Sequence, residues 1–437
     1  MTDELIKLLK LDKLNVNKDL SYVHFDKESL KVHIYLDIKF ISCPKCGSIN
    51  IKRHGYRIKH VIHSISTQEP CHIVFHASRF ICADCNKTFL QANPFSEYLT
   101  RISYTTKLLI LEDLKSHTAT YSSVAALYNV SSRAVMNIFD SYIHSTRSTL
   151  PEILCMDEIY TKNLTKRKYC CVMLNFINQK LVDVVSSRHK YDLIDYFSRI
   201  PKKERENVKY VVIDMYVPYI VVAKSVFFDC KIAVDSFHVI SHLNYAMDTI
   251  RLSIMNKFKK GKSPIKEADL YYYMLKKFHY FFKKNFDDIY NGNIKINKIR
   301  AKWDKWEILK YLLDIDKDLK AAYYLKAKYQ EFNATASYET CDNELLDLIN
   351  GFLNSPFKPF VEFGKLLSHF KEEIKNSFIV IDNRRLSNGA MEGVNSRLKC
   401  LIKNANGYRN FSRFRNRCIY TINKDVPISL YNINNKK

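Results

Sequence analysis

Glycine and proline are scarce in this sequence, at 9 and 10 of 437 residues. A chain so poor in both is neither collagen-like nor of low complexity. Long hydrophobic runs are also missing, because the most apolar stretch, residues 210–228, is interrupted by Asp214, Pro218 and Lys224. The N-terminus has no apolar block of the signal-peptide kind. We therefore expect a globular cytoplasmic protein of two to four domains, with no membrane partner.

Acidic residues are in deficit. Lysine and arginine number 69 against 45 aspartates and glutamates, which gives a net charge of +24. A surplus of this size favours a polyanionic partner, since each phosphate that is neutralised releases counterions. Double-stranded DNA is the leading candidate. The alternative is a coding bias toward Lys, Asn, Ile and Tyr, which would spread the charge evenly over the surface.

Four of the twelve cysteines stand in two CxxC pairs, Cys43/Cys46 and Cys82/Cys85. In a reducing compartment such pairs indicate a metal site rather than disulfides. Four thiolates complete a tetrahedral zinc site that is closed to catalysis, so this zinc would be structural. Alternation in residues 58–65 and 71–80 predicts a β-hairpin between the pairs. We predict a zinc ribbon at 41–92 after an N-terminal segment at 1–40; the alternative is four unrelated buried thiols.

Helical periodicity begins after residue 100. Helices are predicted at 107–114, 121–128 and 132–143, and the short turn between the last two has helix-turn-helix spacing. This predicts a DNA-binding domain at 100–147, although three short helices also occur as a plain packing module. On the third helix Val135, Ile138 and Phe139 would face the core. The side chains that would face a major groove are Ser132, Arg133, Met136 and Asn137.

From residue 153 the pattern changes to strands. The order βββαβαβα over residues 150–244 predicts an α/β domain with a mixed sheet, arranged as in ribonuclease H. Asp157 lies inside the first strand and Asp214 ends the fourth. Two acids on neighbouring strands can share a divalent cation such as Mg²⁺. Each could instead be a strand-end acid satisfied by backbone amides. Glu158 and Asp183 stay open as substitutes, because a one-residue slip in register reverses the face.

Residues 245–382 carry helical runs, and we expect an all-helical insertion there with Trp303 and Trp306 in its core. The C-terminal part, 383–437, should hold a helix whose apolar stripe is Met391, Val394, Leu398 and Leu401. Glu392 lies on the neighbouring face. The basic, aromatic-rich sequence that follows suits a phosphate backbone, or it is a solvated face. Its candidate DNA-binding residues are Lys399, Lys403, Arg409, Arg413 and Arg415.

Over nearly its whole length, the chain resembles the bacterial insertion-sequence transposases of the ISL-three family. The resemblance rests on CPKC and CADC, on MDE at 156–158, on IDMYVPY at 213–219 and on VDSFHVI at 234–240. Its most specific part is SNGAMEGVNSRLK at 387–399, which fits the pattern Asn-x-x-x-Glu-Gly-x-Asn-x-x-x-Lys. One departure is Ser236, which stands where arginine is common.

The resemblance implies a DDE transposase with catalytic Asp157, Asp214 and Glu392. These acids would hold two Mg²⁺ ions, for which Mn²⁺ could substitute. Asp235 and His238 align with secondary positions of the active site. The implied partners are the element ends and target DNA, bound by a homodimer or a larger synaptic complex. Two other functions stay open: a zinc-ribbon and helix-turn-helix transcription regulator, and a ribonuclease-H-like structure-specific nuclease.

Overall fold

The chain forms two compact units. The first comprises residues 1–147, 161–168 and 394–437, and the second comprises 148–160 and 169–393. Both ends of the chain therefore belong to one unit, and the predicted catalytic strands belong to the other. The computed structural model describes residues 1–12, 14–26, 29–38, 42–64, 70–97, 100–162, 164–259, 264–284, 288–289 and 292–428.

A five-stranded sheet forms the N-terminal part of the first unit. Its strands run in the order β1-β2-β4-β3, and β5 pairs with β4. Alternate residues of β4, namely Ile73, Phe75 and Ala77, are fully buried in the core beneath one face. Antiparallel pairing of β3 and β4 confirms the predicted hairpin; of its expected turn at 66–70, residues 66–69 lie outside the described residues. The elements are α1 Asp3–Leu8, β1 Tyr22–Asp26, β2 Ser29–Ile34, β3 Ile51–Ile62, β4 Cys71–Cys82 and β5 Thr88–Leu90.

Three short helices follow this sheet. Each begins directly after a hydroxyl side chain that accepts a backbone N–H, and these caps are Ser103, Thr120 and Ser131. The cap at Ser103 starts the first helix three residues before its predicted start. Val135, Ile138 and Phe139 of the third helix are buried, as predicted. The helices are α2 Tyr104–Asp113, α3 Tyr121–Leu127 and α4 Ser132–Tyr142.

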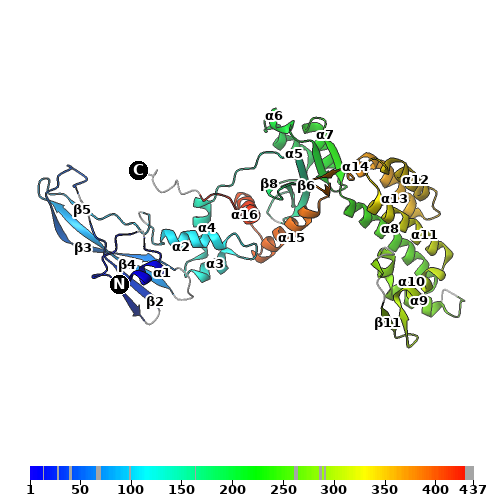
Figure 1. The fold of residues 1–437 in the computed structure, drawn as a ribbon, viewed down its shortest axis with the longest axis horizontal. Coiled ribbons are helices and arrows are strands. Elements are labelled where there is room, and N and C mark those ends of the chain that lie inside the picture. Colours follow the sequence, from blue (N-terminus) through cyan, green and yellow to red (C-terminus); the bar gives the residue numbers. More distant parts are fainter. Residues whose placement is uncertain are drawn as a thin grey trace. The chain divides into compact units, whose positions relative to one another are not determined.

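The last helix of the chain, α16 Phe411–Asn423, packs against these three helices (Figure 1). The hydroxyl of Tyr420 donates to the carbonyl of Leu111 over 2.9 Å, and its ring is fully buried in their core. Arg417 is only 1% exposed and donates to the carbonyls of Ser116 and Ala119, both at 3.0 Å. Helix α16 therefore completes a hydrophobic core that begins 300 residues earlier in the sequence.

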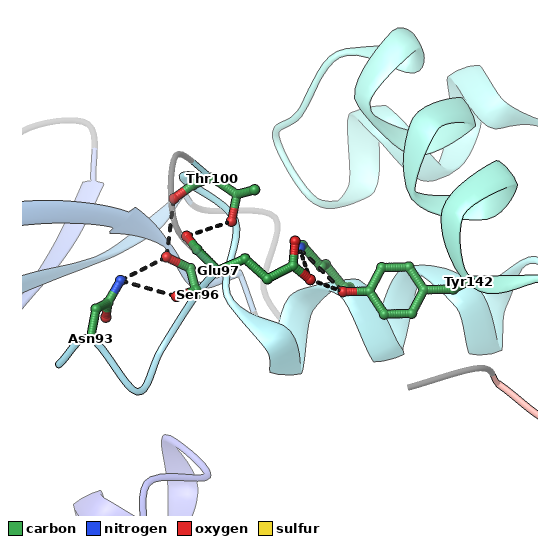
Figure 2. A network of polar contacts seen from close by, with 6 residues as sticks. Asn93, Ser96, Glu97, Thr100 and Tyr142 are labelled. Carbon is green, nitrogen blue, oxygen red and sulfur yellow. Dashed lines mark hydrogen bonds and ion pairs between the residues drawn. The ribbon is translucent and has the colours of Figure 1, made fainter. Parts of the chain in front are cut away.

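A polar network joins helix α2 to the segment that precedes it (Figure 2). The ammonium of Lys107 lies 3.1 Å from a carboxylate oxygen of Glu97 and donates to the hydroxyl of Tyr142 over 3.3 Å. That hydroxyl also donates to Glu97. Ser96 donates to the carbonyl of Thr100, which fixes the backbone on either side of Glu97. A nearly buried lysine is thus compensated by both an acid and a hydroxyl.

The second unit is built on a five-stranded mixed sheet in the order β10-β9-β6-β7-β8. Strands β6, β7 and β8 are antiparallel neighbours, and β9 and β10 add in parallel on the other side of β6. The sheet is mixed, as predicted, and its first and fourth strands, β6 and β9, are neighbours. The elements are β6 Ile153–Tyr160, β7 Tyr169–Asn175, β8 Leu181–Val185, α5 Lys190–Ser198, α6 Lys202–Arg205, β9 Tyr210–Ile213, α7 Val217–Val226, β10 Lys231–Val234 and α8 Ser236–Lys257.

The insertion after α8 is not all-helical, contrary to our prediction. It contains an antiparallel pair, β11 Asn293–Ile296 and β12 Ala301–Asp304, and a 3₁₀ helix η1 His279–Lys283 (Figure 1). In β11 the sequence Asn-Ile-Lys-Ile alternates with the period of a strand, and only Ile296 is fully buried. The helices are α9 Ala268–Lys277, α10 Lys305–Asp314, α11 Lys317–Thr335, α12 Cys341–Leu353, α13 Lys358–His369 and α14 Lys371–Asn376.

The two tryptophans differ in environment. Trp303 on β12 packs against the main core, as predicted. Trp306 is 39% exposed, so its predicted place in the core is wrong. It lies in the first turn of α10, where the cap residue Asp304 accepts its backbone N–H over 2.8 Å.

The chain returns from the insertion through a short hairpin, β13 Val380–Ile381 and β14 Arg384–Arg385, into helix α15 Gly389–Asn404. Met391, Val394 and Leu398 of α15 are fully buried and Leu401 is 2% exposed, so the predicted apolar stripe is confirmed.

No helix in the described parts of the chain is long and apolar enough to cross a membrane.

Candidate active site

The sheet of the second unit places two acids side by side. Strands β6 and β9 run parallel, and their last paired residues are Cys155 and Val212. Asp157 and Asp214 each lie two residues further along, so both project from the same face at the same edge of the sheet. The carboxylate of Asp157 accepts the amide of Glu158 over 2.7 Å, and that of Asp214 accepts the amide of Tyr216 over 3.0 Å.

Glu158 joins these two aspartates. Carboxylate oxygens of Asp157, Glu158 and Asp214 all lie within 4.8 Å of one another, and all three residues are half-buried. Oxygen donors at this spacing suit a hard divalent cation such as Mg²⁺. Glu158, considered from sequence only as a substitute for Asp157, lies in the cluster beside it.

The two aspartates disfavour the charged form of Glu158. Burial, together with the charges of Asp214 and Asp157, raises the pKa of Glu158 to about 6, against the opposing effect of Arg188. Burial also raises the pKa of Asp214, despite the amide of Tyr216 and the nearby His238. A bound cation would relieve this repulsion, and the donor set therefore fits a metal centre.

Two further predicted residues lie near this cluster. Asp235 is 2% exposed and begins helix α8, where its carboxylate accepts the amide of Phe237 over 3.4 Å. Burial raises the pKa of Asp235, and the half-buried His238 partly opposes this rise, as it does for Asp214.

Asp183, the other substitute considered from sequence, is buried and accepts hydrogen bonds from Tyr196 and from the amide of Val184, both at 2.7 Å.

Glu392 lies in the first turn of α15 and is exposed. Its amide donates to the carbonyl of Asn388 over 3.1 Å. The side-chain amide of Asn388 in turn donates to the carbonyl of Met156, the residue before Asp157, over 3.3 Å. The start of α15 is therefore attached to the strand that carries Asp157. Glu392 itself is not a member of the group of three acids.

The four predicted zinc ligands come together in the first unit. The sulfur atoms of Cys43, Cys46, Cys82 and Cys85 all lie within 4.8 Å of one another. The sulfurs of Cys43 and Cys85 are 3.6 Å apart, as are those of Cys46 and Cys82. The amides of Cys85 and Asp84 lower the pKa of the Cys82 thiol, which favours the thiolate that a metal requires. The cluster is compatible with zinc.

The two CxxC loops have the same backbone conformation. In each loop the residue four positions after the first cysteine donates its amide back to that cysteine's carbonyl, Gly47 to Cys43 over 2.8 Å and Asn86 to Cys82 over 2.9 Å. Both residues have positive φ, at 75° and 53°, which glycine and asparagine tolerate best. Two loops of one shape thus present their thiols to a single point.

The family model that matches this chain is described as a transposase, that of the ISL-three DDE transposases, and it matches residues 154–418. The match begins in β6 and ends in α16, so it spans Asp157, Asp214, Asp235 and Glu392 and covers more than half of the chain. The chain belongs to this family of insertion-sequence transposases. No curated protein matches the sequence.

The predicted DNA-binding residues of this transposase fall into two groups. Ser132, Arg413 and Arg415 are half-buried and already make hydrogen bonds within the protein. Nε of Arg413 donates to both carboxylate oxygens of Asp140 at 2.9 and 3.0 Å, and its Nη2 donates to Oδ2. Arg415 donates to the carbonyl of Ser145 over 2.7 Å. The exposed residues are Arg133, Asn137, Lys399, Lys403 and Arg409.

Sequence reasoning missed two residues at the transposase's acid cluster. Arg188 donates to Glu158 over 2.7 Å, and Asn388 contacts the strand that bears Asp157. Asn388 stood in the family-like pattern but was given no role. Arg188 follows the third strand of the sheet in a polar turn, and its sequence context carried no signal of its partner.

Proposed function

We propose that this transposase binds the inverted-repeat ends of an insertion sequence and catalyses Mg²⁺-dependent strand cleavage and strand transfer. The observation that carries the proposal is the convergence of Asp157 and Asp214 on adjacent strands within the region that matches the family. A transcription regulator would have no use for a cluster of half-buried acids at a sheet edge.

We assign the mixed sheet with α5, α7 and α8 to the ribonuclease-H-like fold, on the basis of its strand order β10-β9-β6-β7-β8. The four cysteines and the β3–β4 hairpin would form a zinc ribbon, and α2–α4 a helix-turn-helix domain. The exposed Arg133 and Asn137 on α4 would contact base edges, while Lys399, Lys403 and Arg409 would contact phosphates. Arg413 and Arg415 are engaged internally, so we give them a supporting role.

Asp157, Asp214 and Glu392 would hold the catalytic Mg²⁺. Mg²⁺ supplies activation of the attacking hydroxyl and stabilisation of the leaving oxygen. The chain's own contribution is to keep Asp157 and Asp214 close together in a partly buried site. There His238, near Asp214, can orient a phosphate or a water molecule. Water would cut the element end, and the freed 3′-hydroxyl would then attack a phosphodiester of the target, conserving the number of such bonds. Pairing of two ends implies a homodimer or a larger synaptic complex.

A labelled element end tests the proposal. Wild-type protein should cut and join it with Mg²⁺ or Mn²⁺, whereas Asp157→Asn and Glu392→Ala should lower both steps by at least about 10²-fold. Full cleavage and joining by Glu392→Ala would remove Glu392 from the site. Cleavage without joining in the wild type would favour a structure-specific nuclease. Arg133→Ala should weaken specific end binding by about 1–3 kcal/mol while leaving nonspecific binding nearly unchanged.

A further inference from the structure

The guanidinium of Arg188 lies over two aromatic rings beside the acid cluster. The central carbon of its guanidinium lies 4.0 Å from the ring centroid of Tyr169 and 4.8 Å from that of Tyr216. From this position its Nη1 donates to Oε1 of Glu158 over 2.7 Å. The two charged side chains are 26% and 22% exposed, so solvent screens this pair only partly.

The two rings and Arg188 come from separate elements. Tyr169 is the first residue of β7, Tyr216 lies between Asp214 and helix α7, and Arg188 follows β8. A planar cation that lies over two ring faces is attracted by both rings. Lysine could supply the charge, but its ammonium has no plane to lie over the rings. The geometry therefore uses the shape of the guanidinium as well as its charge.

Glu158 is consequently held by one oxygen only. Oε1 accepts from Arg188, whereas Oε2 is buried and has no hydrogen-bond partner in the described parts of the chain. A buried carboxylate oxygen without a donor is costly unless a cation or a water molecule binds it. Asp157 and Asp214, whose oxygens lie within 4.8 Å, are the other acids that such a cation would contact.

We propose that Arg188 is a positioning residue of the metal centre: fixed by Tyr169 and Tyr216, it holds Glu158 so that the free oxygen joins Asp157 and Asp214 on one divalent ion. The inference rests on the proposed function, because it assumes that these acids bind the ion. It adds Glu158 as a ligand and gives Arg188 an indirect role through that ligand.

Two effects of Arg188 on metal affinity have opposite signs. As a nearby positive charge it repels a cation, so its removal would tighten binding if charge alone mattered. As a hydrogen-bond partner that orients a ligand it promotes binding, and loss of such partners typically weakens metal affinity 10–100-fold. The sign of the change therefore distinguishes a positioning residue from a bystander charge.

The experiment measures Mn²⁺ binding to the full-length protein without DNA, by electron paramagnetic resonance of the free ion. Arg188→Met should weaken Mn²⁺ binding about tenfold, and Arg188→Lys should weaken it nearly as much. The matched control is Arg199→Met, because Arg199 lies in the same domain in an exposed pair with Asp195. That variant should bind Mn²⁺ like the wild type.

A double-mutant cycle tests whether Arg188 acts through Glu158. Glu158→Gln alone should weaken Mn²⁺ binding, and adding Arg188→Met to it should cause little further loss. An equal loss in both backgrounds would overturn the positioning role, as would unchanged or tighter binding by Arg188→Met. Should Arg188→Met fail to fold, Tyr216→Leu and Tyr216→Phe replace it. Loss of affinity in the leucine variant alone is expected, and equal affinity in the two would contradict the proposal.

Asp157→Asn separates this inference from the proposed function. If Asp157→Asn leaves Mn²⁺ affinity unchanged, the metal centre itself is misassigned. If Asp157→Asn abolishes binding while Arg188→Met has no effect, the metal centre stands and only the role of Arg188 is lost.

Discussion

The side-chain amide of Asn388 donates a hydrogen bond to the backbone carbonyl of Met156 over 3.3 Å, although 232 residues separate the two in sequence. Asn388 immediately precedes α15, and Met156 immediately precedes Asp157. This bond attaches the helix that carries Glu392 to the strand that carries Asp157. It is one of several contacts through which the chain returns from its long insertion to this sheet; the side-chain amide of Asn376, for example, donates to the carbonyl of Ile232 in β10 over 2.9 Å.

Asn388→Ala should therefore impair both stability and catalysis. The residue is 1% exposed, and loss of its bond to Met156 costs about 1 kcal/mol of unfolding free energy. The cost is not larger, because Oδ1 of Asn388 has no hydrogen-bond partner in the described structure and disappears with the side chain. Urea unfolding measures the first effect and cleavage of a labelled end the second. Asn256→Ala, at an exposed position of α8, is the control; equal behaviour of the two variants would contradict the prediction.

Cys43→Ser should release zinc from the first unit. A site closed by four thiolates loses most of its affinity with one ligand, so metal content should fall from about one zinc per chain to near zero. Inductively coupled plasma mass spectrometry measures this, and thermal unfolding should show a lower melting temperature. The control is Cys230→Ser, which changes a half-buried cysteine outside the cluster. This variant should retain about one zinc per chain. Full zinc content in Cys43→Ser would remove Cys43 from the site.

Lys107→Met should destabilise the first unit by about 2 kcal/mol. The ammonium of Lys107, on a side chain that is 6% exposed, pairs with Glu97. Because the side chain of Glu97 is 27% exposed, water solvates part of its charge once Lys107 is removed, which reduces the loss of stability. Adding Glu97→Gln should restore part of the loss, since the orphaned charge is then removed. Lys115→Met, which breaks a more exposed pair with Glu112, should cost less than about 0.5 kcal/mol. Chemical denaturation compares the four proteins, and equal costs for the two lysines would refute the assignment.

Lys326 should make stability depend on pH. Burial lowers its pKa to about 7, and its ammonium donates to the carbonyl of Lys284 over 2.5 Å. Between pH 7 and the unfolded value near 10.5, the unfolded chain binds one more proton than the folded chain. The free energy of unfolding should therefore rise with pH from 7 to 9, by up to about 1 kcal/mol per pH unit.

Lys326→Met should flatten this rise, whereas Lys328→Met, at an exposed position of the same helix, should retain it. Urea titrations at pH 7, 8 and 9 provide the comparison. A wild-type protein that loses stability over this range would show that the group stays charged in the folded state.

Local patterns in the sequence were enough to predict the strands and the thiol cluster. The apolar runs around Asp157 and Asp214 predicted the strands, and the short turns between them limited how those strands could pair. Spacing of the cysteines predicted their convergence because a CxxC loop is itself a local structure. The β11–β12 pair was missed since each strand is only four residues long and Ile296 is the only fully buried residue of the two.

The contacts of Glu158 could not be predicted in the same way. Alternation along β6 places Asp157 and Glu158 on opposite faces, yet near the edge of the sheet both carboxylates reach the same cluster. Arg188 is fixed there by Tyr169 and Tyr216, which come from two other segments. Such a site depends on the packing of three loops, and no periodicity in any one of them encodes it.

Helix α16 has a consequence for the order of events during synthesis. Tyr420 and Arg417 fill and cap the core of α2–α4, so that core stays open until the ribosome has made α16. Domains near an N-terminus usually fold while the rest is still being translated. Here the helices α2–α4 would complete their core only after the whole catalytic-sheet region and its insertion have been made, and a chain that stops before α16 would leave that core exposed.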